Sequence, residues 1–203
     1  VGPACAADDG GTVWFVSHRS SGSGGWYSTP KALLHATPNS SGWVANTRTG
    51  IALGDYSISD RCDVMSAYGN CTNGTGYLWF APNNLSQLER LTITNKEVKA
   101  KTIFNAPAAP GAGVGYAKQI SANRILWQKA LSGDQTDVVQ IGTINGSSIT
   151  WEKTGLKVCR NGLNGFNLGD REIIVYSSSK TKITLYDYTN KIVLYEVTPF
   201  SSE

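Results

Sequence analysis

Four aspartates stand in turn-like segments of this chain, where paired carboxylates could serve as a general acid and a general base. They are Asp55, Asp60, Asp63 and Asp170. Two carboxylates that flank a glycosidic bond are the machinery of most glycoside hydrolases. No dense run of aspartates supplies the six to eight oxygens that calcium needs, and neither His18 nor His35 lies in a hydrolase or zinc motif. Enzyme activity therefore stays open, with no bound metal or cofactor expected.

Aromatic side chains offer a second kind of chemistry, because a ring can stack on a sugar while nearby polar groups bind its hydroxyls. Five of them are predicted to lie near hairpin ends or in loops, namely Trp26, Tyr27, Trp43, Trp151 and Tyr188. Three other tryptophans, Trp14, Trp79 and Trp127, occupy similar places in hydrophobic strands and are expected in the core. The first group is the candidate ligand-binding set.

The elements that must position these residues recur along the chain. Hydrophobic strands begin at Tyr77, Arg124 and Glu172, about 47 residues apart, and each is followed by a polar gap and a two-stranded hairpin. A repeat of this length in an all-strand protein is typical of propeller blades. Hairpin turns are expected at Thr94-Asn95, Ile144-Asn145 and Thr189-Asn190. The sequence predicts an all-β fold, a small β-propeller of four blades, with a β-sandwich as the alternative.

Four repeat units fill most of the chain, and we expect one all-β domain over residues 1–203. The units cover approximately residues 11–45, 76–105, 123–155 and 170–200. Residues 46–75 break the rhythm and are predicted to be an irregular insertion with its own disulfide. A five-blade count is the alternative, because Gly50–Asp55 echoes Gly165–Asp170 and a shortened unit could begin at Tyr56.

The cysteines and glycosylation motifs indicate a compartment. The chain has four cysteines, an even number, and their spacing does not match that of zinc ligands. We therefore predict two disulfides, Cys62–Cys71 and Cys5–Cys159. Five N-x-S/T acceptor motifs occur, at Asn39, Asn70, Asn73, Asn84 and Asn145. Together with the lack of an initiator methionine, which favours a removed signal segment, these features predict a secreted, extracellular glycoprotein.

Charge and hydrophobicity exclude some classes of binding partner. The formal charge of +3 is small and the basic residues are scattered, so nucleic acid is not expected as a partner. No apolar run is long enough to span a membrane. Glycans or a cell-surface protein are the expected partners, and the oligomeric state is left open.

Two propeller groups bear comparison. The segment Ser147–Trp151 resembles the Ser-x-Asp-x-Gly-x-Thr-Trp turn of sialidase-type propellers, but it lacks the Asp and the Gly. In overall style the repeats are similar to those of fungal and bacterial propeller lectins, without a diagnostic motif, so no family is assigned. The leading hypothesis is a secreted, non-catalytic recognition module that binds carbohydrate or a cell-surface partner. The alternatives are a secreted glycoside hydrolase or lyase, and a structural or adhesive extracellular protein.

Overall fold

The structure, a computed structural model, describes residues 5–17, 32–39, 41–45, 51–59, 64–82, 86–107, 115–129, 137–159, 163–179 and 182–198. Contacts divide the chain into two compact units, Val1–Pro107 (unit 1) and Ala108–Glu203 (unit 2). Each unit is described by itself below. The predicted single domain over the whole chain stays a prediction.

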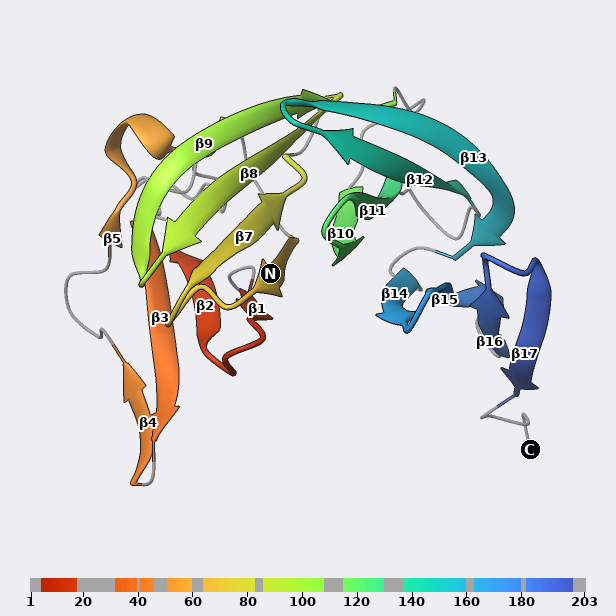
Figure 1. Cartoon of the computed structure of the whole chain (residues 1–203), viewed down its shortest axis with the longest axis horizontal. Coiled ribbons are helices and arrows are strands. Elements are labelled where there is room, and N and C mark those ends of the chain that lie inside the picture. The colour runs from red at the N-terminus through yellow and green to blue at the C-terminus, as the bar shows by residue number, and fades with distance from the viewer. Residues whose placement is uncertain are drawn as a thin grey trace, which may run out of the picture. The chain divides into compact units, whose positions relative to one another are not determined.

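Unit 1 holds two antiparallel sheets, coloured red to yellow-green in Figure 1. The first sheet orders its strands as β1-β2-β3-β4, with β5 added to β3, and the second as β6-β7-β8-β9. The strands of the first sheet are β1 (Cys5–Ala7), β2 (Val13–Ser17), β3 (Ala32–Asn39), β4 (Gly42–Ala45) and β5 (Ile51–Ala52). A 3-10 turn, η1 (Gly54–Tyr56), leads to β6 (Met65–Gly69), β7 (Thr75–Phe80), β8 (Gln87–Thr94) and β9 (Glu97–Asn105).

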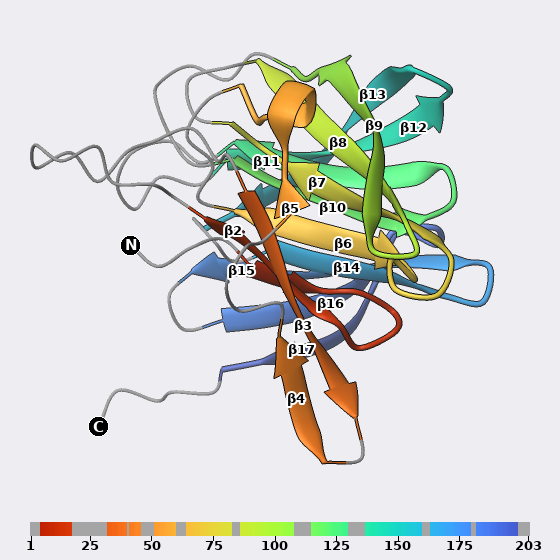
Figure 2. The same ribbon diagram turned by 90° about the vertical axis from the view of Figure 1, so that its left-hand side faces the viewer.

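Unit 2 repeats the same meander twice (Figures 1 and 2). The third sheet is ordered β10-β11-β12-β13 and the fourth β14-β15-β16-β17. Their strands are β10 (Gly115–Ser121), β11 (Arg124–Lys129), β12 (Asp137–Asn145), β13 (Ser148–Val158), β14 (Leu163–Leu168), β15 (Arg171–Ser179), β16 (Lys182–Asp187) and β17 (Ile192–Val197). Four four-stranded meanders in sequence are the blades of a β-propeller, so the predicted all-β, four-blade fold is confirmed.

Alternation of apolar side chains along the strands gives each unit its core. In unit 1, Trp14 and Leu33 of the first sheet pack with Leu78 and Leu91 of the second. In unit 2, Leu126 and Ile141 of the third sheet pack with Ile174 of the fourth. Trp14, Trp79 and Trp127 are at most 2% exposed, as expected of core residues.

The hairpin turns fall where the sequence predicts them. Asn95 and Lys96 both have positive φ, 50° and 67°, between β8 and β9, which is the pattern of a type I′ turn. Gly146, at φ 61°, turns β12 into β13.

The segment expected to be an irregular insertion, 46–75, differs from the prediction. It contributes β5, η1 and the whole of β6, which pairs with β7 from Met65↔Phe80 to Gly69↔Gly76. The residues Met65-Ser66-Ala67-Tyr68-Gly69 are mostly small, which hides a strand from a hydrophobicity pattern. Tyr56, the proposed start of a fifth unit, lies in η1, and the described residues form four sheets.

The predicted disulfides are corrected. Cys71 and Cys159 are free thiols, so neither Cys62–Cys71 nor Cys5–Cys159 is present. Cys71 is fully buried in the core of unit 1, and this burial raises the pKa of its thiol to about 12. Its role there is that of a small apolar core residue rather than of a cross-link.

Candidate functional site

A polar pocket lies in unit 2, where three hairpin turns of the third and fourth sheets meet. Its volume is about 440 Å³. The turns are β10–β11, β14–β15 and β16–β17, and the lining residues are Ser121, Asn123, Arg124, Asn167, Asp170, Glu172, Tyr188, Thr189 and Lys191. Since turns vary without disturbing the sheets, this is a position where a propeller can carry a specific site.

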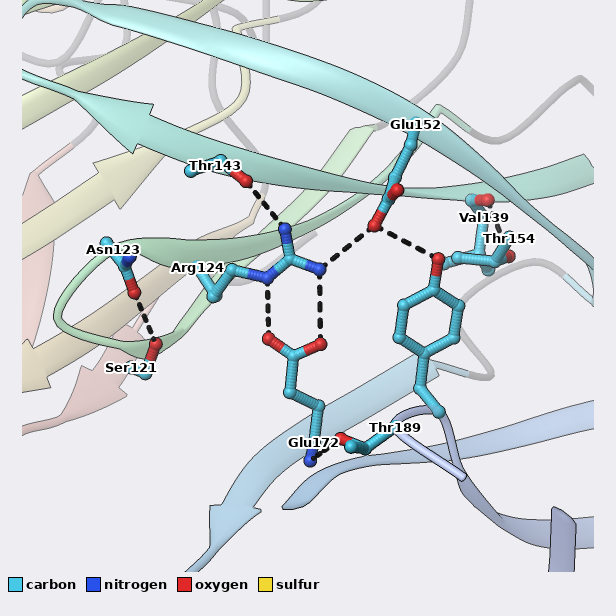
Figure 3. A network of polar contacts seen from close by, with 10 residues as sticks. Ser121, Asn123, Arg124, Val139, Thr143, Glu152, Thr154, Glu172 and Thr189 are labelled. Carbon is cyan, nitrogen blue, oxygen red and sulfur yellow. Dashed lines mark hydrogen bonds and ion pairs between the residues drawn. The ribbon is translucent and has the colours of Figure 1, made fainter. Parts of the chain in front are cut away.

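Arg124, the first residue of β11, organises the pocket wall (Figure 3). Its Nε and Nη2 donate to the two carboxylate oxygens of Glu172, at 2.5 and 3.1 Å. Nη1 donates to Thr143 Oγ1 at 2.6 Å, and Nη2 also donates to Glu152 Oε1 at 3.0 Å. The paired hydrogen bonds to Glu172 raise the pKa of Arg124, so its positive charge is fixed and fully engaged.

Tyr188 extends the same network. The Tyr188 hydroxyl donates to Glu152 Oε1 at 3.1 Å. Burial, followed by this bond to Glu152, raises the pKa of Tyr188 to about 12. The hydrogen bond from Arg124 lowers the pKa of Glu152. Glu152 is therefore held ionised and Tyr188 neutral at physiological pH.

Lys191 covers Tyr188 and has an unusual backbone. Its φ is 60°, in the left-handed region that L residues seldom adopt. The Lys191 Nζ lies 2.9 Å from the centroid of the Tyr188 ring, a cation–π contact. Partial burial lowers the pKa of Lys191. Lys191 lies in the turn between β16 and β17, and hairpin turns commonly place a residue in this region.

Asn167 and Asp170 present free polar groups to the pocket. Both belong to the β14–β15 region and are exposed. Within the described part of the chain, neither side chain has a hydrogen bond or ion pair, in contrast to Arg124 and Glu172. Asn123, on the β10–β11 turn, accepts a hydrogen bond from the Ser121 hydroxyl through Oδ1 at 3.3 Å, which leaves its amide nitrogen available.

No metal site accompanies this pocket among the residues that the structure describes. The described His, Cys, Asp and Glu residues include no group of three or more that could hold an ion. The described residues also contain no helix long and apolar enough to cross a membrane.

Two of the sequence-predicted site residues, Asp170 and Tyr188, line the pocket. The stacking role expected of Tyr188 is not available on the face that Lys191 covers. Trp151, in β13, packs on the backbone of Gly142, whose added Cβ would lie 2.9 Å from the indole ring. It belongs to the packing of its own sheet.

The other predicted site residues lie elsewhere. Asp55 is exposed in η1 of unit 1. Trp43 is part of β4, and its side chain lies outside the described residues, as do Trp26, Tyr27, Asp60 and Asp63 altogether. Because Asp60 and Asp63 lie outside the described residues and Asp55 and Asp170 belong to different units, the expected aspartate pair stays a prediction.

The pocket residues that the sequence did not single out are mainly charged or amide groups at hairpin ends. Arg124 opens β11, and Glu172 is the second residue of β15, after Arg171. Charged residues at the starts of these repeated strands were the available signal.

Comparisons with known proteins bear on the fold. No protein-family model and no curated protein matches the chain. A crystal structure of AztD from Citrobacter koseri is similar over 97% of this chain and 46% of its own, with 10% identity and a TM-score of 0.51. The apo AztD structure from that organism covers the same shares at 10% identity and a TM-score of 0.48. Dihydro-heme d1 dehydrogenase NirN in complex with DHE is similar over 98% of this chain and 48% of its own, with 12% identity and a TM-score of 0.36. The chain thus spans about half the length of these structures, and at such identities the likeness concerns the fold alone.

Proposed function

We propose that this chain is a non-catalytic binding protein whose unit 2 pocket takes a neutral, hydroxyl-rich ligand, namely a carbohydrate. The observation that carries the proposal is that some polar side chains at the pocket bind one another, while others are unengaged. Arg124 forms hydrogen bonds with Glu152 and Glu172, so the polar atoms of these three side chains are already engaged. Asn167 and Asp170, in contrast, line the pocket with free polar groups.

The charges around the pocket disfavour an anionic ligand. The pocket lining holds two carboxylates, Asp170 and Glu172, and two cations, Arg124 and Lys191. Glu152, next to the lining, adds a third carboxylate through its ion pair with Arg124. Both carboxylate oxygens of Glu172 already hold Arg124. A phosphate or sulfate would therefore meet no unengaged guanidinium and a local excess of negative charge.

The free groups suit sugar hydroxyls, each of which donates one hydrogen bond and accepts others. The Asn167 amide both donates and accepts, and the Asp170 carboxylate accepts. The volume of about 440 Å³ lies within the range of ligand pockets, roughly 300–1,000 Å³.

Hydrolysis is less well supported than binding. A glycosidase needs one carboxyl group whose pKa is raised so that it can donate a proton at neutral pH. The pKa of Glu152 is lowered instead, and Glu172 is engaged at both oxygens. Two carboxylates that bind the same arginine are suited to holding that arginine in place rather than to acting as general acid and general base.

A glycan array probed with the 203-residue chain tests the proposal. We expect discrete binding to neutral glycans, with sulfated and sialylated glycans at background level. Binding restricted to the anionic glycans would contradict it, and so would release of reducing sugar from the bound neutral glycan.

Secretion is part of the same proposal. Because the predicted disulfides are absent, the support for secretion comes from the glycosylation motifs. Asn39, Asn73 and Asn145 are exposed, which suits glycan attachment, whereas Asn70 is partly buried and Asn84 lies outside the described residues. The side-chain oxygen of Asn70 accepts hydrogen bonds from the backbone N–H groups of Thr72 and Asn73. Expression through a eukaryotic secretory route should give a mass that falls on endoglycosidase treatment, and an unchanged mass would contradict glycosylation.

A further inference from the structure

The Asn164–Gly165 peptide bond in β14 places a backbone nitrogen against a side-chain carboxamide. The Gly165 N–H donates to Asn164 Oδ1, with 2.8 Å between the nitrogen and the oxygen. Since Oδ1 is bonded to Cγ, the nitrogen lies beside the carbon that it could attack. Glycine in the following position has no Cβ to hinder the approach. The pair is therefore arranged for a reaction of the chain with itself.

Lys118, on β10 of the same unit, contacts the same oxygen. Its Nζ donates to Asn164 Oδ1 at 2.7 Å. Because Lys118 and Gly165 both donate, the atom between them is the carboxamide oxygen rather than its nitrogen. An ammonium beside a carbonyl oxygen stabilises the negative charge that develops there when a nucleophile attacks the carbon. Lys118 thus activates the carboxamide for attack.

The ladder of the fourth sheet does not engage the Gly165 N–H. Leu168↔Arg171 closes the two-residue turn between β14 and β15, and the closing pair of such a turn is hydrogen-bonded. The two kinds of pair alternate along an antiparallel ladder, so Gly165↔Ile174 is a non-hydrogen-bonded pair. Among the described strands, β14 pairs with β15 alone. Attack by the Gly165 nitrogen therefore breaks no ladder hydrogen bond.

We propose that Asn164 is a self-modification site, at which the Gly165 nitrogen attacks Asn164 Cγ while Lys118 polarises the carbonyl. The bond from the Gly165 nitrogen to Cγ forms and the Cγ–Nδ2 bond breaks. Ammonia leaves with the proton that the Gly165 nitrogen gives up. Water then opens the cyclic succinimide and yields aspartate or isoaspartate at position 164, so the chain exchanges ammonia for water without an oxidant or a cofactor.

The modification changes the contact between β10 and β14. A carboxylate at position 164 pairs with the Lys118 ammonium, so a hydrogen bond to a neutral amide becomes an ion pair. The isoaspartate product instead adds a methylene group to the main chain of β14, which disturbs the alternation of side chains along that strand. Both products place a new negative charge beside Lys118.

Two other Asn–Gly bonds in the described residues serve as internal controls. Asn73 precedes Gly74 between β6 and β7, and Asn145 precedes Gly146 between β12 and β13. In the described part of the chain, neither asparagine side chain accepts a hydrogen bond from its glycine or from a lysine. The reaction at these two sites should therefore not depend on Lys118.

Incubation of the full chain, produced without glycans, tests the proposal by peptide mass mapping over time at neutral pH. The peptide that contains Asn164 should gain about 1 Da as the amide becomes an acid. Lys118→Met should slow this gain about tenfold, because the donor to the developing oxyanion is lost. Lys118→Arg keeps a charged donor and should restore most of the rate. The rates at Asn73 and Asn145 should be the same in all three proteins, and circular dichroism checks that each variant folds.

The same incubation in denaturant separates local geometry from sequence. In the unfolded chain Lys118 no longer lies beside Asn164, so Lys118→Met should leave the rate at Asn164 unchanged. An intact Asn164 in the folded wild type, an unaltered rate in folded Lys118→Met, or equal slowing at Asn73 and Asn145 would each overturn the proposal. A covalent cross-link between Lys118 and Asn164 would also overturn it, because Lys118 rather than Gly165 would then be the nucleophile.

Discussion

At the scale of single residues, Arg124 accounts for the chemistry of the pocket. Its guanidinium is shared between Glu172, Glu152 and Thr143, so it acts as a fixed centre that positions carboxylates rather than as a receptor for an anion. Tyr188 is held through Glu152 and covered by Lys191. The unengaged groups beside this cluster are those we expect to bind ligand.

The link between Glu152 and Tyr188 is measurable. In Glu152→Gln, the negative charge that opposes ionisation of Tyr188 is removed, so the pKa of Tyr188 should fall from about 12 while burial keeps it above the ordinary 10.0. Ultraviolet titration of tyrosinate, or NMR of ring-labelled tyrosine, measures this pKa. Glu97→Gln, an exposed glutamate of unit 1, serves as the control. A Tyr188 pKa that Glu152→Gln leaves unmoved would contradict the assigned hydrogen bond.

At the scale of elements, Asp8 ties the first and second sheets of unit 1 together. It is 6% exposed, and its carboxylate accepts hydrogen bonds from the Thr12 and Cys71 backbone N–H groups, the Thr72 hydroxyl and the Trp14 indole. These donors lie on the β1–β2 turn, on β2 and on the β6–β7 turn. One carboxylate thus holds two hairpins in a fixed relation.

Removal of this carboxylate should destabilise unit 1. Asp8→Ala leaves several buried donors unsatisfied, and we expect a loss of about 3 kcal/mol in the free energy of unfolding. Chemical denaturation measures the loss. The neighbouring Asp9 is exposed and accepts one hydrogen bond, from the Gly69 N–H, so Asp9→Asn should cost less than about 1 kcal/mol. Equal losses for the two variants would refute the role given to Asp8.

A close approach between sheets in unit 2 gives a second prediction. A Cβ at Gly165, on β14, would lie 2.3 Å from Leu126 Cδ1 and 3.1 Å from the Ile173 carbonyl oxygen. Leu126 is fully buried and the carbonyl is backbone, so Gly165→Ala should cost about 2 kcal/mol of stability. Gly74→Ala, whose Cβ would meet its nearest atom at 3.4 Å, is the tolerant control. A stable Gly165→Ala protein would show that the third and fourth sheets are less tightly packed than described.

The sequence predicts the elements better than the site. Repeated hydrophobic strands and their hairpin turns identify the blades, because alternation and turn chemistry are local properties. The strand β6 is missed because Met65–Gly69 offers mostly small residues. The first strands of the next two sheets, β10 and β14, also contain small residues, so comparison with them could have identified β6. Asp170 and Tyr188, which the sequence singles out, line the pocket. The partnership of Arg124 with Glu172 depends on contact between residues of different sheets, which no local pattern reveals.

At the scale of the whole molecule, a modestly basic chain carries a pocket whose charges are internally compensated. The formal net charge is +3, and the two cations that line the pocket, Arg124 and Lys191, are matched by two carboxylates, Asp170 and Glu172. Long-range attraction therefore adds little to the binding of a neutral sugar. Its affinity should change less than about twofold when the ionic strength rises from roughly 0.05 to 0.5 M. A steep fall with salt, measured by calorimetry, would point to an anionic ligand instead.

The central claim is that the unengaged polar groups of the unit 2 pocket bind a neutral carbohydrate, and calorimetric titration of matched variants tests it most directly. With a neutral glycan identified on the array, Asn167→Ala and Asp170→Asn should each weaken binding by about tenfold, the equivalent of ~1.4 kcal/mol. Asp55→Asn, an exposed aspartate of η1 in unit 1, should bind as the wild type does. Unchanged affinity in both pocket variants, or equal weakening by Asp55→Asn, would contradict the assignment of this pocket.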